Sequence, residues 1–233
     1  MIRIDKLISN QTNYSRKEIK NLIKQKRIKI NNIVIDKSDI KVEENKDIIL
    51  VDDKELTYKK YVYLILNKPK GYISSTEDKI NKTVIDLVPE KYQHRNLFPA
   101  GRLDKDTTGL ILITDDGAFA HNILSPKKHI KKTYKVVIDK EITEEMIDLF
   151  KRGLPLKDEI CKEAVLEKID SNTGIVILTE GKYHQIKRMF KYFDSEVIEL
   201  QRIGLGNYYL TNDFKEKECK ELTEEELNLI QCK

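Results

Sequence analysis

The chain has 233 residues, of which 39% are hydrophobic and 35% are charged, and its formal net charge is +4. This length allows two modest domains, and no apolar run approaches the roughly 18 residues that a membrane-spanning helix needs. The composition predicts a soluble globular protein. Because the N-terminus lacks the apolar segment of a signal peptide, we expect a cytoplasmic location.

Cysteine and histidine are sparse in this chain. The three cysteines and four histidines lie far apart in the sequence. Their positions give neither a disulfide framework nor the CxxC spacing of a zinc site. We therefore expect a protein without a metal site.

The first 32 residues are strongly basic, with nine basic and two acidic residues. Residues 3–10 and 16–25 have the apolar spacing of amphipathic helices, and Ser15 and Glu18 form a capping box before the second one. The basic residues expected to bind RNA here are Arg3, Arg16, Lys17, Lys20, Lys24 and Arg27. The charge asymmetry favours a polyanion-binding surface, and the alternative is a solvated basic face without a ligand.

Three short strands are expected to complete this N-terminal unit, at residues 28–30, 33–35 and 47–51. Asn31 and Asn32 separate the first two strands. Asparagine tolerates the left-handed backbone conformations of a tight hairpin, so this pair predicts a turn.

The N-terminal unit is similar to an S4 domain, a small RNA-binding fold. The segments that carry the resemblance are residues 3–8, 15–18 and 22–31. The resemblance implies an RNA-binding domain, which we place at residues 1–58. S4 domains often have glycine where Lys26 and Asn32 stand in this chain. A side chain in a left-handed helix cap at Lys26 costs about 1 kcal/mol relative to glycine.

Residues 52–60 are polar and lack apolar periodicity, so we expect a linker there and a second domain at residues 59–233. The strands expected in it are residues 61–66, 110–113, 132–138, 165–169, 175–179 and 197–203. The helices expected in it are residues 118–124, 143–152, 183–193 and a C-terminal one after the capping box at residues 223–226. Because strands outnumber helices and short connections join many of them, we predict an α+β domain with a mostly antiparallel mixed sheet flanked by helices.

One aspartate of the second domain has a distinctive position. Asp104 ends the segment Gly-Arg-Leu-Asp on a glycine-bounded connection that leads into the apolar strand at residues 110–113. In a later helix, Lys187 and Arg188 flank an apolar stripe, so one of them can point into a neighbouring cleft. A cation there would pair with the aspartate and favour its ionised form, which a nucleophile or a base requires. The sequence leaves open which cation does so, and Asp104 alone could be an ordinary turn residue.

Four segments of the second domain form an ordered set of motifs: residues 66–71, 98–104, 132–134 and 183–190. This set resembles the pseudouridine synthases, which isomerise uridine within RNA. The S4-like unit points to the branch that modifies ribosomal RNA. Residues 105–110 and 182–188 are most similar to its small-subunit, or RsuA, type. The resemblance implies an enzyme that needs no cofactor.

The resemblance also implies a role for each matching residue. Asp104 attacks C1′ of the ribose or removes a proton from C2′, so that the glycosidic bond breaks and the uracil rejoins through C5. Arg102 occupies the gap that the flipped nucleotide leaves, Tyr134 stacks on the target base, and Lys187 is the cation beside the aspartate. The other residues expected at the substrate are Ile186, Arg188 and Lys132. Lys132 belongs to a basic cluster with Lys127, Lys128 and Lys131. The sequence leaves two interpretations of this cluster open: a rim that binds RNA phosphates, or lysines that are simply solvated.

The expected partner is 16S ribosomal RNA or a small-subunit assembly particle, and the protein is expected to act as a monomer. One alternative is a synthase acting on 23S ribosomal RNA, and another is a catalytically silent RNA-binding or ribosome-assembly protein. A glycoside or nucleoside hydrolase would need two carboxylates, and the sequence offers no convincing second one. The sequence does not identify the modified uridine, and it does not separate C1′ attack from C2′ deprotonation.

Overall fold

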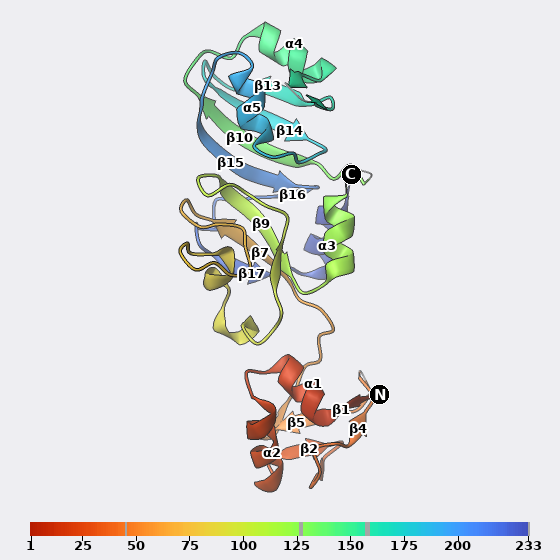
Figure 1. The fold of residues 1–233 in the computed structure, drawn as a ribbon. Helices are drawn as coiled ribbons and strands as arrows, with labels where there is room; N and C mark the ends of the chain where they lie inside the picture. The colour runs from red at the N-terminus through yellow and green to blue at the C-terminus, as the bar shows by residue number, and fades with distance from the viewer. Residues whose placement is uncertain (45, 126–127, 157–158, 233) are drawn as a thin grey trace. The chain divides into compact units, whose positions relative to one another are not determined.

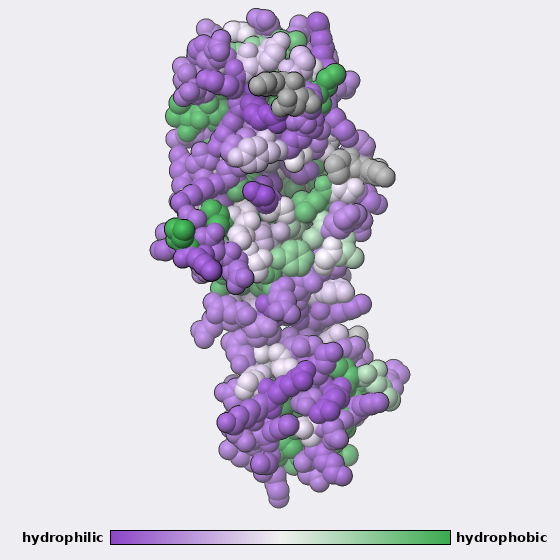
Figure 2. All heavy atoms as spheres, viewed as in Figure 1, coloured by the Kyte–Doolittle hydropathy of each residue, from purple (hydrophilic) through white to green (hydrophobic). Residues whose placement is uncertain are grey.

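The computed structural model describes residues 1–44, 46–125, 128–156 and 159–232, which form two compact units (Figure 1). Unit 1 consists of Met1–Val62 and Val88–Leu97, and unit 2 of Tyr63–Leu87 and Phe98–Lys233. The face drawn in Figure 2 is mainly hydrophilic in both units, with hydrophobic atoms in small groups. No helix within the described residues has the length and apolar character to cross a membrane.

Two helices begin unit 1: α1 (Ile4–Gln11) and α2 (Arg16–Lys24). The Ser15 hydroxyl accepts a hydrogen bond from the Glu18 backbone N–H, and the Glu18 carboxylate accepts one from the Ser15 N–H at 2.7 Å. The apolar faces of both helices are buried, at Ile4, Leu7, Ile8, Ile19, Leu22 and Ile23. The two predicted helices and their capping box are confirmed.

A four-stranded antiparallel sheet completes unit 1 in the order β3-β2-β5-β6. Its strands are β2 (Ile28–Ile30), β3 (Ile33–Val34), β5 (Ile49–Val51) and β6 (Lys54–Glu55). Asn31 and Asn32 form the expected left-handed turn, with φ of 50° and 68°. A separate pair, β1 (Ile2–Arg3) and β4 (Lys41–Val42), was not predicted because strands of two residues show no alternation.

The linker predicted at residues 52–60 starts too early. Lys54–Glu55 pairs with β5 as strand β6, and Asp52 and Asp53 make the turn with φ of 54° and 60°. Backbone hydrogen bonds and the ion pairs of Asp52 with Arg27 and of Asp53 with Lys29 hold this hairpin at the edge of the sheet, so the segment needs no apolar periodicity. Aspartate supplies the left-handed turn, because its short side chain tolerates that conformation.

Unit 2 is built on a nine-stranded sheet whose main order is β13-β14-β10-β15-β9-β7-β17. Two further strands pair at its edges, β16 with β15 and β8 with β9, and only β15 and β9 run parallel among these described pairs. The strands are β7 (Tyr63–Lys68), β8 (Phe98–Ala100), β9 (Thr108–Thr114), β10 (Lys132–Ile138), β13 (Val165–Lys168), β14 (Thr173–Leu178), β15 (Val197–Leu205), β16 (Tyr208–Tyr209) and β17 (Cys219–Glu221). The predicted α+β class with a mostly antiparallel mixed sheet is confirmed.

Four α-helices flank this sheet: α3 (Gly117–Leu124), α4 (Glu144–Arg152), α5 (Gln185–Lys191) and α6 (Glu224–Gln231). Smaller elements are the 3₁₀ turns η1 (Val84–Leu87) and η2 (Glu90–Tyr92), the latter in unit 1, and the hairpin of β11 (Pro155–Leu156) with β12 (Glu159–Ile160). Asp116, Thr143 and Thr223 cap α3, α4 and α6, each through a side-chain oxygen that accepts from a backbone N–H, and the capping box predicted at residues 223–226 is confirmed. Helices α3 and α6 contribute Ile123 and Ile230 to the apolar core over β7 and β9.

Two backbone features differ from or refine the sequence prediction. Helix α5 begins at Gln185 rather than at residue 183, because His184 adopts the left-handed conformation, with φ 46° and ψ 34°. Gly109 has φ 100°, and a Cβ atom at this position would lie 2.2 Å from the carbonyl oxygen of Arg202. Glycine therefore lets β9 approach β15 closely at the register pair Gly109–Arg202.

Candidate active site

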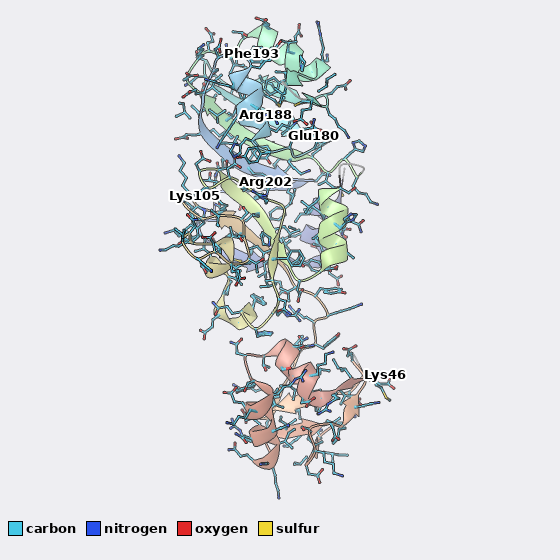
Figure 3. The ribbon with its side chains drawn as sticks, in the orientation of Figure 1. Lys46, Lys105, Glu180, Arg188, Phe193 and Arg202 are labelled. Carbon is cyan, nitrogen blue, oxygen red and sulfur yellow. The ribbon has the colours of Figure 1, made fainter. Side chains whose placement is uncertain are left out.

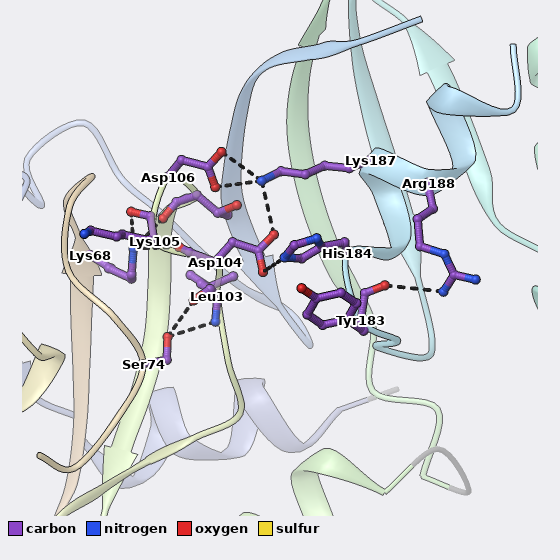
Figure 4. A network of polar contacts seen from close by, with 11 residues as sticks. Lys68, Ser74, Leu103, Asp104, Lys105, Asp106, Tyr183, His184, Lys187 and Arg188 are labelled. Atoms are coloured by element: carbon purple, nitrogen blue, oxygen red, sulfur yellow. Dashed lines mark hydrogen bonds and ion pairs between the residues drawn. The ribbon is translucent and has the colours of Figure 1, made fainter. Parts of the chain in front are cut away.

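A buried lysine holds the backbone of the loop that carries Asp104. Lys68 is fully buried, and its Nζ donates to the backbone oxygens of Asp104 at 3.0 Å, Lys105 at 3.4 Å and Thr107 at 2.7 Å. Burial lowers the pKa of Lys68 from 10.5 to about 8, while the negative charges of Asp106 and Asp104 oppose this shift. The loop therefore has a fixed backbone, from which the Asp104 side chain points away (Figure 4).

The Asp104 carboxylate lies between two side chains from the start of α5 (Figure 4). Its Oδ2 is 3.3 Å from Lys187 Nζ, and its Oδ1 is 3.4 Å from His184 Nε2. The Asp104 side chain is 29% exposed, so it can be reached from solvent while still facing a cation at close range. This geometry holds the carboxylate against the Lys187 ammonium in one orientation.

A second carboxylate shares the same lysine. Lys187 Nζ donates to both oxygens of Asp106, at 2.7 and 2.8 Å. Burial is the largest influence on each partner and acts against its charge, but the ion pair outweighs it in both cases. The pKa of Lys187 is therefore raised by Asp106 and Asp104, and the pKa of Asp106 is lowered by Lys187.

The neighbouring cation Arg188, labelled in Figure 3, points away from Asp104 (Figure 4). Its Nη1 lies 2.8 Å from Glu159 Oε1 in strand β12, and it donates to the Tyr183 backbone oxygen at 3.4 Å. Of the two cations that the sequence left open, Lys187 is therefore the one in contact with Asp104. Arg188 does not line the pocket beside Asp104, and its predicted contact with substrate stays a prediction.

A buried glutamate organises the segment that leads into α5. Glu180 Oε1 accepts from Gln185 Nε2 at 2.7 Å and from the Lys162 backbone N–H at 3.0 Å. The Gln185 side-chain oxygen accepts in turn from the Lys182 backbone N–H at 3.0 Å. These contacts fix the turn that presents His184 and Lys187 to the loop that carries Asp104.

A pocket of about 410 Å³ adjoins Asp104, and we call it the Asp104 pocket. Six of the seven residues predicted to act on the substrate line it: Arg102, Asp104, Lys132, Tyr134, Ile186 and Lys187. Its apolar wall also includes Leu178 and Leu200. Arg102 is exposed and, in the part of the chain that the structure describes, has no hydrogen-bond or ion-pair partner.

Tyr134 and Arg202 face this pocket from adjacent strands. They are register partners in β10 and β15, and alternation along each strand places both on the same side of the sheet. Arg202 is 4% exposed and donates from Nε to the Leu110 backbone oxygen. Its Nη2 is buried and has no hydrogen-bond partner among the described residues. A buried donor without a partner is rare, so Arg202 is a candidate contact for a bound molecule.

Lys132 is the second buried cation of this wall. Its Nζ donates to the Ile130 backbone oxygen at 3.0 Å. The pKa of Lys132 is lowered to about 8, mainly by burial and to a smaller extent by the charge of Arg202. The charge of Glu180 opposes this shift. Of the basic cluster predicted around it, Lys128 and Lys131 are exposed, and Lys127 lies outside the described residues.

The opposite face of the same strands carries a larger hollow of about 570 Å³. Lys135 and Gln201 line it, and each is the chain neighbour of a residue that lines the Asp104 pocket. Among the described residues, its lining includes none of the groups that surround Asp104 apart from Leu200. The chemistry described above therefore belongs to one face of the sheet.

The six residues predicted to bind RNA in unit 1 fall into two sets. Four are exposed on α2: Arg16, Lys17, Lys20 and Lys24. Arg3 pairs with Asp5 at 2.8 Å, and Arg27 holds both carboxylate oxygens of Asp52. Only the α2 set therefore presents cations that are not already engaged in these ion pairs.

Three functional contacts were not found from the sequence. His184 was not assigned to the aspartate, although it directly precedes Gln185 in a matched motif. Lys68 ends strand β7 within the matched segment 66–71 but was given no role, and Arg202 lies in strand β15, where no local pattern marks it as functional. No group of three or more His, Cys, Asp or Glu residues that could hold a metal ion occurs within the described ranges.

The fold and the pocket together define an RNA-modifying class of enzyme, and family comparison agrees. The model of the RNA pseudouridylate synthase family matches residues 62–192, and the model of the S4 domain family matches residues 2–48. The chain belongs to the RNA pseudouridylate synthase family, whose members are isomerases, and carries an N-terminal S4 domain.

Individual relatives cover almost the whole chain. It is 38% identical to an uncharacterised RNA pseudouridine synthase of Bacillus subtilis (strain 168), over 98% of each protein. It is 36% identical to ribosomal small subunit pseudouridine synthase A of Escherichia coli (strain K12), over 97% of this chain and 98% of that protein. A crystal structure of a pseudouridylate synthase matches 99% of this chain and 100% of that one, with 33% identity and a TM-score of 0.69.

Proposed function

We propose that this enzyme isomerises one uridine to pseudouridine in 16S ribosomal RNA, as a monomer acting on the RNA or on a small-subunit particle. The observation that carries the proposal is the position of Asp104, fixed by Lys187 and His184 at a pocket that also holds Tyr134. The similarity to ribosomal small subunit pseudouridine synthase A supports the choice of RNA.

The reaction follows from the chemistry of these groups. A uridine leaves its stack and enters the Asp104 pocket, which costs a few kcal/mol and costs least in a loop or single strand. In one route the Asp104 carboxylate attacks C1′ as the bond between N1 and C1′ breaks, and the new bond from Asp104 to C1′ breaks when C5 bonds to C1′. In the other route Asp104 removes a proton from C2′ as the N1–C1′ bond breaks, and it returns that proton to C2′ when C5 bonds to C1′. The uracil turns, C5 bonds to C1′, and the C5 proton is lost while N1 gains one. Atoms balance, so the RNA keeps its mass.

The remaining pocket residues have matching roles in this proposal. Tyr134 stacks on the base, and Ile186 excludes water beside it. Arg102 has no partner in the described structure and is suited to fill the space that the flipped base leaves in the RNA. Arg202 Nη2 and Lys132 Nζ are suited to donate to the carbonyl oxygens of the uracil.

The proposed division of labour gives RNA affinity to residues 1–58 and catalysis to residues 59–233. The exposed cations of α2 support the first assignment, because phosphates of any sequence attract them. The pocket supports the second, because all of its lining residues lie after residue 100.

The test compares the wild-type protein with Asp104→Asn on 16S ribosomal RNA. Pseudouridine is mapped by carbodiimide modification and primer extension. We expect one modified site with the wild type and none with the variant, while both proteins bind the RNA equally well. Pseudouridine formation by Asp104→Asn would remove the assigned role of the carboxylate.

A second arm separates the candidate RNAs. Both ribosomal RNAs are mapped in cells with and without this protein. Loss of a pseudouridine from 16S RNA supports the proposal, and loss from 23S RNA replaces the substrate. Absence of any change would favour a silent RNA-binding or assembly protein.

A further inference from the structure

An exposed aromatic ring stands beside the catalytic carboxylate. Tyr183 is 70% exposed, and its ring stacks on the His184 ring with centroids 3.8 Å apart and an interplanar angle of 18°. His184 in turn lies 3.4 Å from Asp104 (Figure 4). A large aromatic side chain is thus held in place by its neighbour while much of its surface stays in water.

The backbone holds this pair in an uncommon conformation. His184 is left-handed, which few residues other than glycine adopt, although histidine does so more readily than most. Such conformations persist only where the surroundings enforce them, and they gather at functional sites. Here the Glu180–Gln185 hydrogen bonds enforce the turn, so the Tyr183–His184 stack is a preformed surface.

A second hollow of about 480 Å³ borders this stack, and we call it the rim hollow. It shares five lining residues with the Asp104 pocket: Arg102, Leu103, Asp104, Tyr183 and His184. Its own lining residues are Ile73, Ser74, Ser75 and Lys105. Both hollows fall in the range of about 300–1,000 Å³ that is typical of small-molecule sites. The protein therefore offers two adjoining spaces, and a single aromatic stack borders both.

The chemistry of the rim hollow suits a nucleotide. It combines an aromatic ring with two exposed cations, Arg102 and Lys105, and Ser74 and Ser75 add hydroxyl groups. Proteins that bind single-stranded RNA use this combination, because bases stack on aromatic rings while cations contact the backbone.

The position of the rim hollow restricts which nucleotide it can hold. A uridine in the Asp104 pocket is covalently joined to its two neighbours, so each neighbouring nucleotide must lie at the edge of that pocket. The Tyr183–His184 stack forms part of this edge. Flipping removes stacking between the uridine and its neighbours, and an aromatic surface can replace that stacking for one of them.

We propose that the rim hollow is a second nucleotide subsite, in which the base next to the target uridine stacks on Tyr183. This proposal rests on the proposed function, because it needs a uridine in the Asp104 pocket. The subsite reads a stacked neighbour rather than a particular sequence. The stacked base also holds the Tyr183 ring against His184, and so keeps the contact between His184 and Asp104 in place during the reaction.

The test is a binding cycle between a protein change and an RNA change. The probe is a short single-stranded RNA with one central uridine between two adenosines. Two analogues lack the base on the 5′ or on the 3′ side of the uridine. The proteins are the wild type, Tyr183→Leu and Tyr183→Phe, and the affinity of each pair is measured by fluorescence anisotropy. Tyr192→Leu is the matched control, because Tyr192 is also exposed, at 49%, and does not line either hollow.

We expect Tyr183→Leu to bind the intact RNA about 5- to 150-fold more weakly, which is the usual worth of one base stacked on an aromatic ring. One abasic analogue should weaken the wild type by a similar factor and should weaken Tyr183→Leu no further. Tyr183→Phe keeps the ring and should behave like the wild type, and so should Tyr192→Leu.

Two results would overturn the subsite. One is equal affinity of Tyr183→Leu and the wild type for intact RNA. The other is additive loss in the cycle, which would mean that Tyr183 acts only by supporting His184. The proposed function has a separate readout, since a wild type that completes the binding cycle but forms no pseudouridine in 16S RNA refutes the function and leaves the subsite standing.

Discussion

The two units of this protein place positive charge in opposite surroundings. The cations of α2 in unit 1 are exposed: Arg16, Lys17, Lys20 and Lys24. Around Asp104 in unit 2, Arg102 and Lys105 are exposed, but four other cations are buried or largely buried, and each of these donates to a backbone oxygen or a carboxylate: Lys68, Lys132, Lys187 and Arg202. Exposed cations attract phosphates without fixed geometry, whereas buried cations fix the geometry of a site. The comparison implies that one unit supplies affinity and the other supplies chemistry.

The largest effect should come from the cation that contacts the catalytic carboxylate. Lys187→Met removes the ammonium group that lies 3.3 Å from the Asp104 carboxylate. Among the described residues, the other basic side chain within 4 Å of Asp104 is His184, which is charged only when protonated. We expect pseudouridine formation to fall about 100- to 1,000-fold, as when a single preorganised polar contact is lost from an active site. The measurement is the single-turnover rate on 16S RNA.

Arg188→Met is the matched control for this change. It removes the adjacent cation of the same helix, whose partner is Glu159 rather than Asp104. An equal fall in both variants would mean that net charge matters and that the Lys187–Asp104 contact does not.

The second-largest effect is expected from Lys68, the buried lysine that holds the backbone of the Asp104 loop. Lys68→Met leaves the backbone oxygens of Asp104, Lys105 and Thr107 without its ammonium donor. We expect a loss of about 2–4 kcal/mol in the free energy of unfolding, because buried acceptors without a donor are costly. Chemical denaturation measures it, and Lys70→Met, at an exposed lysine two residues away, should change little.

The pH dependence of this variant sharpens the comparison. The pKa of Lys68 is about 8 in the folded protein and 10.5 without burial, so between these values the unfolded chain binds more protons. Wild-type stability should therefore rise relative to Lys68→Met between about pH 8 and pH 10.5. A constant difference over this range would show that Lys68 keeps its ordinary pKa.

A smaller effect is expected from the exposed cations of unit 1. Changing Lys17, Lys20 and Lys24 to glutamine should weaken RNA binding about 10-fold at low salt. It should also reduce the slope of log affinity against log salt by about 2, since each lost phosphate contact with single-stranded RNA contributes about 0.7. The single-turnover rate at saturating RNA should stay the same.

The charge-matched control changes Lys37, Lys41 and Lys46, which are exposed elsewhere in unit 1. The same loss of affinity in this control would show that total charge, and not the α2 face, attracts the RNA. Titration at several salt concentrations distinguishes the two.

The smallest effect belongs to the partly exposed Asp106. Its pKa is lowered from 3.8, and the pKa of Lys187 is raised from 10.5. The ion pair therefore stabilises the folded protein at pH values above 3.8 and below 10.5, where both groups are charged. Asp106→Asn should lower the free energy of unfolding by about 1 kcal/mol or less. This difference should be constant between about pH 5 and pH 9 and should shrink as the pH falls below about 4. Denaturation across this range checks it, and a difference that grows in acid would reverse the assigned sign.

Most of the fold could be predicted from local patterns. Strand β10 has the predicted limits, and the capping boxes at Ser15 and Thr223 are where the sequence places them. These elements depend on side-chain periodicity and on capping oxygens, which are visible within a few residues. The hairpin at residues 52–55 and the start of α5 were misplaced, because backbone pairing and a left-handed His184 decide them.

The site could be predicted only where motifs mark it. Asp104, Tyr134 and Lys187 lie in recognisable segments, and the structure places all three around one pocket. Lys68 and Arg202 act through contacts with distant parts of the chain, the loop after Asp104 and strand β9. The matched segment 66–71 marks Lys68 without showing what it contacts, and nothing local distinguishes Arg202 from any other arginine in the sequence.

The sequence by itself determined the class of fold, the family and the residue types available for catalysis, because helices, strands and ordered motifs are local properties of the chain. Only the tertiary structure decided which cation meets Asp104, that His184 is its second contact, and that Tyr183 borders two hollows. The reason is physical: partners separated by some 80 residues meet only after the sheet has formed, and packing then selects Lys187 over Arg188.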